Sequence, residues 1–191
     1  LIGALYHEIG THAIRRVNYE KQPWYKKKTR YGFISYLETE EGLATLHSLI
    51  PKSFPLAYPA ARQYIAVALA QQHGFADTYK QLQKYIQDPE RRWKITFRQK
   101  RGIKDTSQAG GFSKDLLYFS GLIKVFSWLQ DHQYNPTQLY FGKMALEDVE
   151  HAVELNPDFQ PLLPSFYLSS PKKYAQSLIK IGQENFFTEA L

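Results

Sequence analysis

The chain has 191 residues, of which 43% are hydrophobic, so it is long enough for one domain with a buried core and too short for us to expect two. Its 24 Lys and Arg outweigh 18 Asp and Glu, and the net charge of +6 favours an acidic partner or substrate but is too small to indicate nucleic acid. The absence of cysteine excludes disulfides and thiolate metal sites, so a metal ion would have to be held by histidine and carboxylate.

The first two predicted elements are helices separated by a loop. Leu5, Ile9 and Ala13 recur at helical spacing, which predicts a helix over about residues 1–17. Residues 18–30 show no hydrophobic period, so we expect a loop there. Acidic residues then precede an apolar run near Glu41, as is typical of the first turn of a second helix.

The middle of the chain contains two further predicted helices and one ambiguous segment. A proline near the helix start and an alanine-rich run predict a helix over residues 58–71 that ends by Gly74. Residues 77–86 are predicted to form another amphipathic helix. In residues 93–98 apolar and polar side chains alternate, so a short strand or extended piece competes with helix there.

The last third of the chain is predicted to be helical, with breaks that contain proline. Ser113 is the expected N-cap of a long, largely buried helix that reaches about Leu129, and residues 135–137 break the pattern. Helices are expected over residues 139–155 and 171–185. The sequence therefore predicts a mainly α fold with a minor extended part.

No run of about 18 apolar residues appears, which excludes a transmembrane helix of ordinary length, and the N-terminus has no charged region followed by an apolar one. We therefore expect a soluble, cytoplasmic protein that binds neither a membrane nor nucleic acid. The sequence has no initiating methionine and only six residues precede His7, so we expect an N-terminally truncated fragment.

Near the N-terminus, His7-Glu8-Ile9-Gly10-Thr11-His12 places a glutamate between two histidines, as in a zinc peptidase, but with one residue more than the H-E-x-x-H motif has. On a regular helix His7 and His12 would point about 140° apart and could not bind one ion. A single π-type turn would bring them together, because five residues then make roughly one turn, and Gly10 lowers the steric cost of that distortion. The alternative is a surface helix with two unrelated histidines.

A catalytic zinc ion needs three protein ligands and one open position for water. Glu41, in Glu40-Glu41-Gly42-Leu43-Ala44, follows His12 after enough residues for the chain to leave through a loop and return on a second helix. His47 is the competing candidate. Because six residues on a helix amount to about 240°, only one of Glu41 and His47 can be the third ligand.

Several segments together resemble one family of proteins. They are His7 to His12, Asn18 with Gln22-Pro23-Trp24, Thr39 to Ala44, Lys100 to Thr106, Gly111 to Tyr118, Gly142-Lys143 and Leu163-Pro164. The chain resembles the microtubule-associated tyrosine carboxypeptidases and their bacterial relatives, the flavohaemoglobin expression-modulating QEGLP-motif proteins. Glu40-Glu41-Gly42-Leu43-Ala44 stands where the bacterial pattern has Gln-Glu-Gly-Leu-Pro, so the subfamily and its substrate stay open.

The resemblance implies that residues 1–191 form a single zincin-like, gluzincin-type metallopeptidase domain that binds Zn²⁺ through an HExxxH motif. His7, His12 and Glu41 would be the zinc ligands. Glu8 would be the catalytic carboxylate, taking a proton from water and passing it to the leaving amine. The implied activity is that of a carboxypeptidase that removes a C-terminal tyrosine or another bulky residue from a protein or peptide.

The resembling segments also suggest residues that act on the substrate. Lys114 and Tyr118 are candidate donors to the oxyanion, with a solvated lysine and a half-buried aromatic ring as the alternatives. Arg101 is the first candidate to hold the terminal carboxylate of the substrate and Lys143 the second, although either could be a surface charge. The run Lys26-Lys27-Lys28 would attract an acidic tail such as that of tubulin, or would simply be solvated.

Two alternative functions stay open at the level of the sequence. Within the peptidases, the chain could be a zinc aminopeptidase or endopeptidase, which would not require a free carboxylate on the substrate. Outside that class, it could be a non-catalytic basic module that binds an acidic protein partner and keeps the metal site only as a relic.

Overall fold

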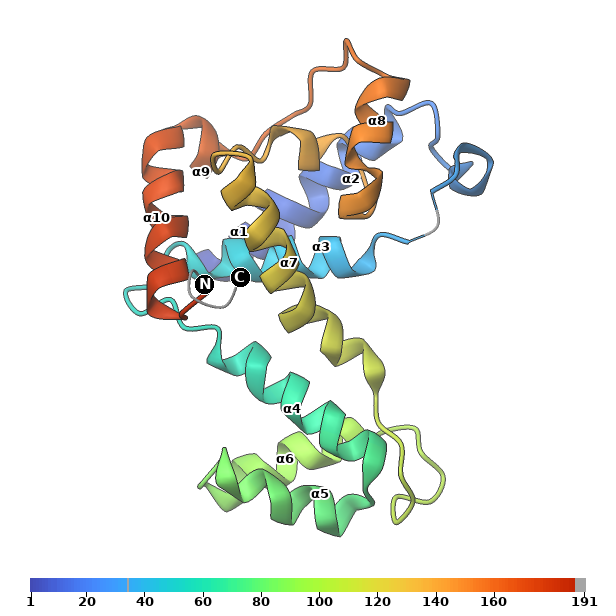
Figure 1. Ribbon diagram of the computed structural model, residues 1–191, viewed down its shortest axis with the longest axis vertical. Coiled ribbons are helices and arrows are strands. Elements are labelled where there is room, and N and C mark those ends of the chain that lie inside the picture. Colours follow the sequence, from blue (N-terminus) through green and yellow to red (C-terminus); the bar gives the residue numbers. More distant parts are fainter. Residues whose placement is uncertain (34, 188–191) are drawn as a thin grey trace. The chain divides into compact units, whose positions relative to one another are not determined.

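The computed structural model describes residues 1–33 and 35–187 (Figure 1). Its regular structure is helical, and no strand occurs in those two ranges. The contacts divide the chain into two compact units, Leu1–Leu56 with Gly121–Leu191 and Ala57–Ser120. Within the described ranges, no helix has the length and apolar character that crossing a bilayer requires. The prediction of a mainly α chain is confirmed, whereas the single domain and the zincin-like fold stay predictions.

The first unit begins with a helix that contains a π-turn. It consists of α1 (Ile2–His7), a π-helix (Glu8–Ala13) and α2 (Ile14–Glu20), so the predicted loop begins only after Glu20. A 3₁₀ turn (Lys28–Tyr31) precedes α3 (Leu37–Leu49). Figure 1 shows α3 beside α1. Helix α3 also contacts the π-helix, so the two helices predicted to carry the ligands pack against each other.

The C-terminal part of the first unit consists mostly of short elements. They are the end of α7 (Leu116–Asp131), 3₁₀ turns at Thr137–Tyr140 and Leu146–Asp148, α8 (Val149–Leu155), α9 (Ser165–Leu168) and α10 (Pro171–Glu184). The helix predicted for residues 139–155 is wrong over its first half. Gly142 adopts a φ of +144°, which no L side chain readily adopts, so the chain turns there and becomes α-helical only at Val149.

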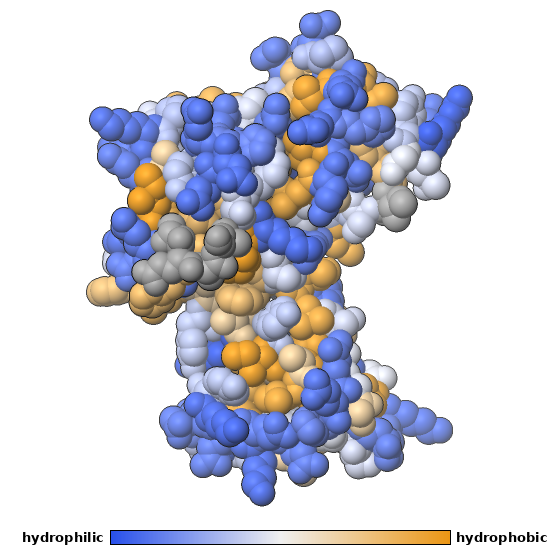
Figure 2. Space-filling model, in the orientation of Figure 1, coloured by the Kyte–Doolittle hydropathy of each residue, from blue (hydrophilic) through white to orange (hydrophobic). Residues whose placement is uncertain are grey.

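The second unit is a small helical cluster. It contains α4 (Tyr58–Gln72), α5 (Phe75–Gln81), a 3₁₀ turn (Leu82–Lys84), α6 (Pro89–Lys100) and a further 3₁₀ turn (Ser113–Asp115) that leads into α7. Helix α4 packs on α5 and α6 around the buried side chains of Ala66, Leu82, Ile86 and Ile95. On the visible surface of each unit, Figure 2 shows many hydrophilic side chains interspersed with exposed apolar ones.

In the second unit, the extended alternative for residues 93–98 and the N-cap prediction for Ser113 are wrong, whereas the competing helical alternative for residues 93–98 is confirmed. Residues 93–98 lie inside α6, because the buried side chains of Arg92, Ile95, Thr96 and Gln99 recur at helical spacing, which their mixed polarity hides in the sequence. The expected extended part is therefore absent from the described ranges. Ser113 is not a helix N-cap, because it is the first residue of the 3₁₀ turn Ser113–Asp115. The cap position before that turn is occupied by Phe112.

Helices α3 and α7 touch through glycine backbones. A Cβ atom added to Gly42 would lie 2.2 Å from the carbonyl carbon of Gly121, and one added to Gly121 would lie 2.1 Å from the carbonyl oxygen of Glu38. Only glycine allows so close an approach. Because Gly42 directly follows Glu41, this contact sets the position of the segment of α3 that carries the predicted third ligand.

Replacing Gly42 with alanine is expected to destabilise the first unit. Alanine gains up to about 1 kcal/mol of helix propensity, but overpacking against the Gly121 backbone outweighs this, so we expect a net loss of about 1–3 kcal/mol in the free energy of unfolding. Denaturant unfolding measures this loss, with Thr45→Ala, a half-buried position on the same helix, as the control. A Gly42→Ala protein as stable as the parent would show that α3 and α7 can separate without cost.

Candidate metal centre

The π-helix brings His7 and His12 to the same side of the helix. Helix α1 ends at His7, and the π-helix follows over Glu8–Ala13, so the five-residue spacing closes about one turn. The two imidazole rings lie edge to face with centroids 4.8 Å apart. The bulge that the sequence requires for a shared ion is therefore present.

Side-chain hydrogen bonds hold the backbone at and around the π-helix. The Tyr140 hydroxyl donates to the Gly10 carbonyl at 2.7 Å, and the Thr11 hydroxyl donates to the Tyr6 carbonyl at 2.9 Å. Gly10 also has a packing role that the sequence did not show, because a Cβ atom there would lie 2.5 Å from a ring carbon of Phe166 and would force that ring to move. Packing against Phe166 and these two hydrogen bonds therefore stabilise the widened turn.

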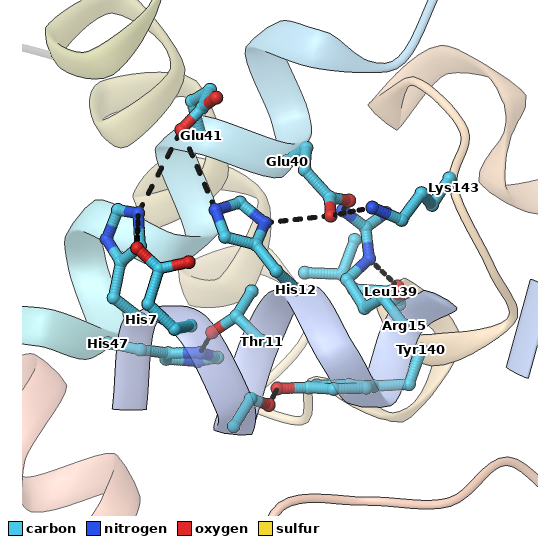
Figure 3. A network of polar contacts seen from close by, with 12 residues as sticks. His7, Thr11, His12, Arg15, Glu40, Glu41, His47, Leu139, Tyr140 and Lys143 are labelled. Carbon is cyan, nitrogen blue, oxygen red and sulfur yellow. Dashed lines mark hydrogen bonds and ion pairs between the residues drawn. The ribbon is translucent and has the colours of Figure 1, made fainter. Parts of the chain in front are cut away.

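Glu41 approaches the two histidines from α3, and Figure 3 shows the three side chains converging. Its Oε2 lies 3.7 Å from Nε2 of His12 and 4.0 Å from Nε2 of His7, and the candidate ligand atoms of the three residues all lie within 4.8 Å of one another. A tetrahedral ion with bonds of about 2.1 Å separates its ligand atoms by roughly 3.4 Å, so side-chain movements of up to about 1.4 Å would complete the set. Two imidazoles and one carboxylate form a donor set that fits a divalent ion such as zinc and leaves a coordination position open.

Glu8 lies beside this group without belonging to it. Its Oε1 is 3.9 Å from Nε2 of His7, and its side chain is 68% exposed, whereas that of Glu41 is only 10% exposed. A carboxylate placed in this way can reach water next to the centre. This arrangement suits the division of roles that the sequence predicts for Glu8 and Glu41.

His47, the competing candidate for the third ligand, is fully buried and uses both ring nitrogens elsewhere. Because the Thr11 hydroxyl proton is given to Tyr6, His47 Nδ1 must donate to Thr11 Oγ1 at 2.8 Å, and Nε2 accepts from the Tyr174 hydroxyl at 2.9 Å. Burial, with the charges of Arg15 and His7, lowers the pKa of His47 to about 3. His47 is therefore a neutral structural residue, and Glu41 is the candidate that the geometry favours.

Glu40 holds His12 from the side opposite Glu41. Nδ1 of His12 donates to Glu40 Oε1 at 2.8 Å, which leaves Nε2 directed at Glu41. Lys143 Nζ donates to the same oxygen at 2.7 Å, and the buried Arg15 guanidinium pairs with Oε2. Burial alone would raise the pKa of Glu40, but Arg15, the His12 hydrogen bond and Lys143 outweigh it and lower the pKa to about 2. An ionised carboxylate thus fixes the His12 tautomer that presents Nε2 to a metal.

His7 is also held in the form that binds metals. Burial and the neighbouring His12 lower its pKa, against the opposing effects of Glu8 and Glu41. The neutral imidazole, which is the form that ligates a metal, is therefore favoured.

The predicted site residues fall into both units. The structure places five of them together in the first unit: His7, Glu8, His12, Glu41 and Lys143. The other three belong to the second unit, where the Arg101 guanidinium stacks 3.6 Å from the centre of the Phe112 ring, Lys114 is exposed and Tyr118 is half-buried.

Sequence reasoning gave no role to Glu40 or Arg15. A signal for both was available, because Glu40 neighbours the predicted ligand and Arg15 lies one helical turn after His12. An acidic pair at a helix start is ordinary, however, and an arginine on a helix is usually solvated.

The match to known proteins covers nearly the whole chain. Residues 2–184 match the family described as microtubule-associated tyrosine carboxypeptidase. The chain belongs to the microtubule-associated tyrosine carboxypeptidase family. The resemblance that the motifs indicate is confirmed.

Individual members of the microtubule-associated tyrosine carboxypeptidase family match over the full chain. Microtubule-associated tyrosine carboxypeptidase 1 of Homo sapiens is 36% identical over 192 residues, which is 100% of this chain and 40% of the relative. The protein of the same name from Rattus norvegicus is 37% identical over 194 residues, 100% of this chain and 41% of its own length. MATCAP2 of Mus musculus is 34% identical over 192 residues, 100% of this chain and 37% of its own length. The chain thus spans about two fifths of the length of these relatives.

Proposed function

We propose that this chain carries the catalytic centre of a zinc-dependent, zincin-type carboxypeptidase that removes a C-terminal tyrosine or another bulky residue. The observation that supports it is the convergence of His7, His12 and Glu41, with the exposed carboxylate of Glu8 beside them. Its relatives are named tyrosine carboxypeptidases, which supports the carboxypeptidase class. The name "microtubule-associated" and the net charge of +6 support an acidic protein tail, such as that of tubulin, as the substrate.

In this proposal each residue near the centre has one task. When bound, zinc would supply a Lewis acid that polarises the scissile carbonyl and makes water more acidic near neutral pH. A carboxylate oxygen of Glu8 accepts a proton from the attacking water, and Glu8 then donates that proton to the leaving amine. Glu40 keeps the Nδ1 proton of His12 in place, so the imidazole does not rotate or change tautomer during the reaction.

Other residues of the chain are candidates for the substrate itself. We retain Lys114 and Tyr118 as candidate donors to the oxyanion, and Arg101 and Lys143 as candidates for the terminal carboxylate. Of these four, Lys143 is connected to the metal centre within the first unit, through Glu40 and His12.

Metal analysis coupled to peptide cleavage tests the proposal. The peptides share one sequence and differ only in the last residue and in a free or amidated C-terminus. We expect a stoichiometric zinc ion, release of the last residue from the free acid, and no cleavage of the amide. Chelation should abolish the activity, and added zinc should restore it.

The same experiment separates the alternatives. Cleavage that is indifferent to amidation would favour an endopeptidase, and release of the first residue would favour an aminopeptidase. A zinc-loaded chain that binds acidic peptides but cleaves none of them would favour the non-catalytic module. Absence of any bound metal would contradict the assignment of His7, His12 and Glu41.

A further inference from the structure

We propose that Lys28, together with Lys143, forms a carboxylate-binding subsite next to the metal centre, which receives an acidic group of the peptide substrate. This inference rests on the proposed peptidase function. It assigns a role to one lysine of the Lys26-Lys27-Lys28 run and separates it from its two neighbours.

The three lysines of the run have different environments. Lys26 and Lys27 are exposed, whereas Lys28 is half-buried at the start of the 3₁₀ turn Lys28–Tyr31. The Lys28 ammonium lies 3.7 Å from the centre of the Tyr36 ring and 4.8 Å from that of Tyr19. At such distances the face of an aromatic ring attracts a cation and orients it.

Contacts connect Lys28 to the metal centre through Tyr36. Lys143 Nζ lies 5.9 Å from the centre of the same Tyr36 ring and binds Glu40 Oε1, the oxygen that accepts from His12. The two ammonium groups thus share one aromatic ring, and one of them is a direct neighbour of the residue that orients a candidate ligand.

The charges in this region do not balance. Arg15 and Lys143 pair with the buried carboxylate of Glu40, and Lys28 interacts electrostatically with both of these cations as well as with Glu40 and Asp148. Arg15 is satisfied by Glu40 and by the backbone carbonyls of Leu139 and Met144, and Lys143 by Glu40. For Lys28, no carboxylate of residues 1–33 or 35–187 lies within ion-pair distance.

The surroundings of Lys28 disfavour its protonated, charged form. Burial, Arg15 and Lys143 lower its pKa to about 8, although Glu40 and Asp148 oppose the shift. A half-buried cation with a surplus of like charge around it is stabilised when an anion binds. A carboxylate of the substrate would provide that anion.

The segment that carries Lys28 is fixed in place. The fully buried Trp24 packs against Phe33, with ring centroids 5.1 Å apart, and anchors the chain on both sides of the 3₁₀ turn. The Phe33 backbone N–H donates to the Lys28 carbonyl at 3.1 Å. Lys28 is therefore held in position before a substrate arrives, which favours selective binding.

The test compares Lys28→Met with Lys27→Met in binding three labelled peptides. One peptide ends in Glu-Glu-Tyr with a free carboxylate, the second has the same sequence with an amide end, and the third ends in Gln-Gln-Tyr with a free carboxylate. Fluorescence anisotropy in a Glu8→Gln background keeps each peptide intact. Methionine preserves the apolar stem against the two tyrosines, and thermal unfolding checks that the variant is folded.

We expect Lys28→Met to weaken binding of the acidic peptide about tenfold or more, whereas Lys27→Met changes it by less than about twofold and Lys28→Arg retains most of it. If the loss disappears with the amide, the terminal carboxylate is the bound group. If the loss disappears with the Gln-Gln-Tyr peptide, the bound group is an acidic side chain of the peptide.

Equal affinities for Lys28→Met and Lys27→Met would overturn the subsite, as would an equal loss for all three peptides. The proposed function can fail separately. A zinc-loaded parent chain that cleaves no peptide would count against the peptidase, while the binding comparison still decides the role of Lys28.

Discussion

Replacing Glu8 with glutamine is expected to reduce peptide hydrolysis by about 10²–10⁴-fold while leaving the metal bound. Glutamine keeps the size of the side chain but cannot accept and return a proton. Because the convergent group consists of His7, His12 and Glu41, and Glu8 is an exposed residue beside that group, its loss should not remove a ligand. Metal content and steady-state cleavage, measured on the same preparation, check both halves of this prediction.

A matched variant controls for the loss of one negative charge. Glu20→Gln changes an exposed carboxylate that pairs with Arg16 and with no other cation of residues 1–33 and 35–187, so activity and metal content should both stay unchanged. Metal content that falls together with activity in Glu8→Gln would mean that Glu8 is itself a ligand. Undiminished hydrolysis would remove it from the chemistry altogether.

The N-terminal half of the candidate centre could be predicted from the sequence because its constraint is local. Two histidines five residues apart cannot share an ion on a regular helix, so the spacing itself requires the π-turn that the structure contains. The role expected for Gly10 was incomplete, because the structure shows that its missing side chain makes room for Phe166.

The other half depends on contacts between distant segments and could not be predicted in the same way. Glu40 and Glu41 are adjacent, so on a helix they point about 100° apart, and the rotation of α3 decides which one faces the histidines. That rotation is set where Gly42 meets Gly121. The family resemblance therefore selected Glu41, and local reasoning could not assign Glu40 to the opposite side of His12.

The errors in the fold prediction have a similar origin. Trp93 and Phe97 are apolar but exposed, so residues 93–98 look like a half-buried strand in a short window, whereas the buried positions of α6 include the polar side chains of Arg92 and Gln99. Lys28 likewise looks like its solvated neighbours until the aromatic rings around it are known. Buried polar side chains follow tertiary contacts, which sequence periodicity does not record.

Replacing Glu40 with glutamine is expected to lower the affinity for zinc by about 10–100-fold and the free energy of unfolding by about 3–5 kcal/mol. The ionised carboxylate accepts from His12 and Lys143 through Oε1 and from Arg15 through Oε2. A glutamine must turn its NH₂ group towards one of these donors and leaves the buried Arg15 charge without a counterion. Zinc competition titration and denaturant unfolding measure the two losses.

A second variant separates metal binding from stability. In Arg15→Met/Glu40→Leu both members of the buried pair are replaced by apolar side chains of similar size, which is often neutral or stabilising, and the partly exposed Lys143 can turn towards water. We expect this variant to regain most of the stability that Glu40→Gln loses. The weakened zinc affinity should persist, because nothing then holds the Nδ1 proton of His12. Recovery of zinc affinity together with stability would show that Glu40 serves the fold alone, and that packing around the π-helix is sufficient to orient His12.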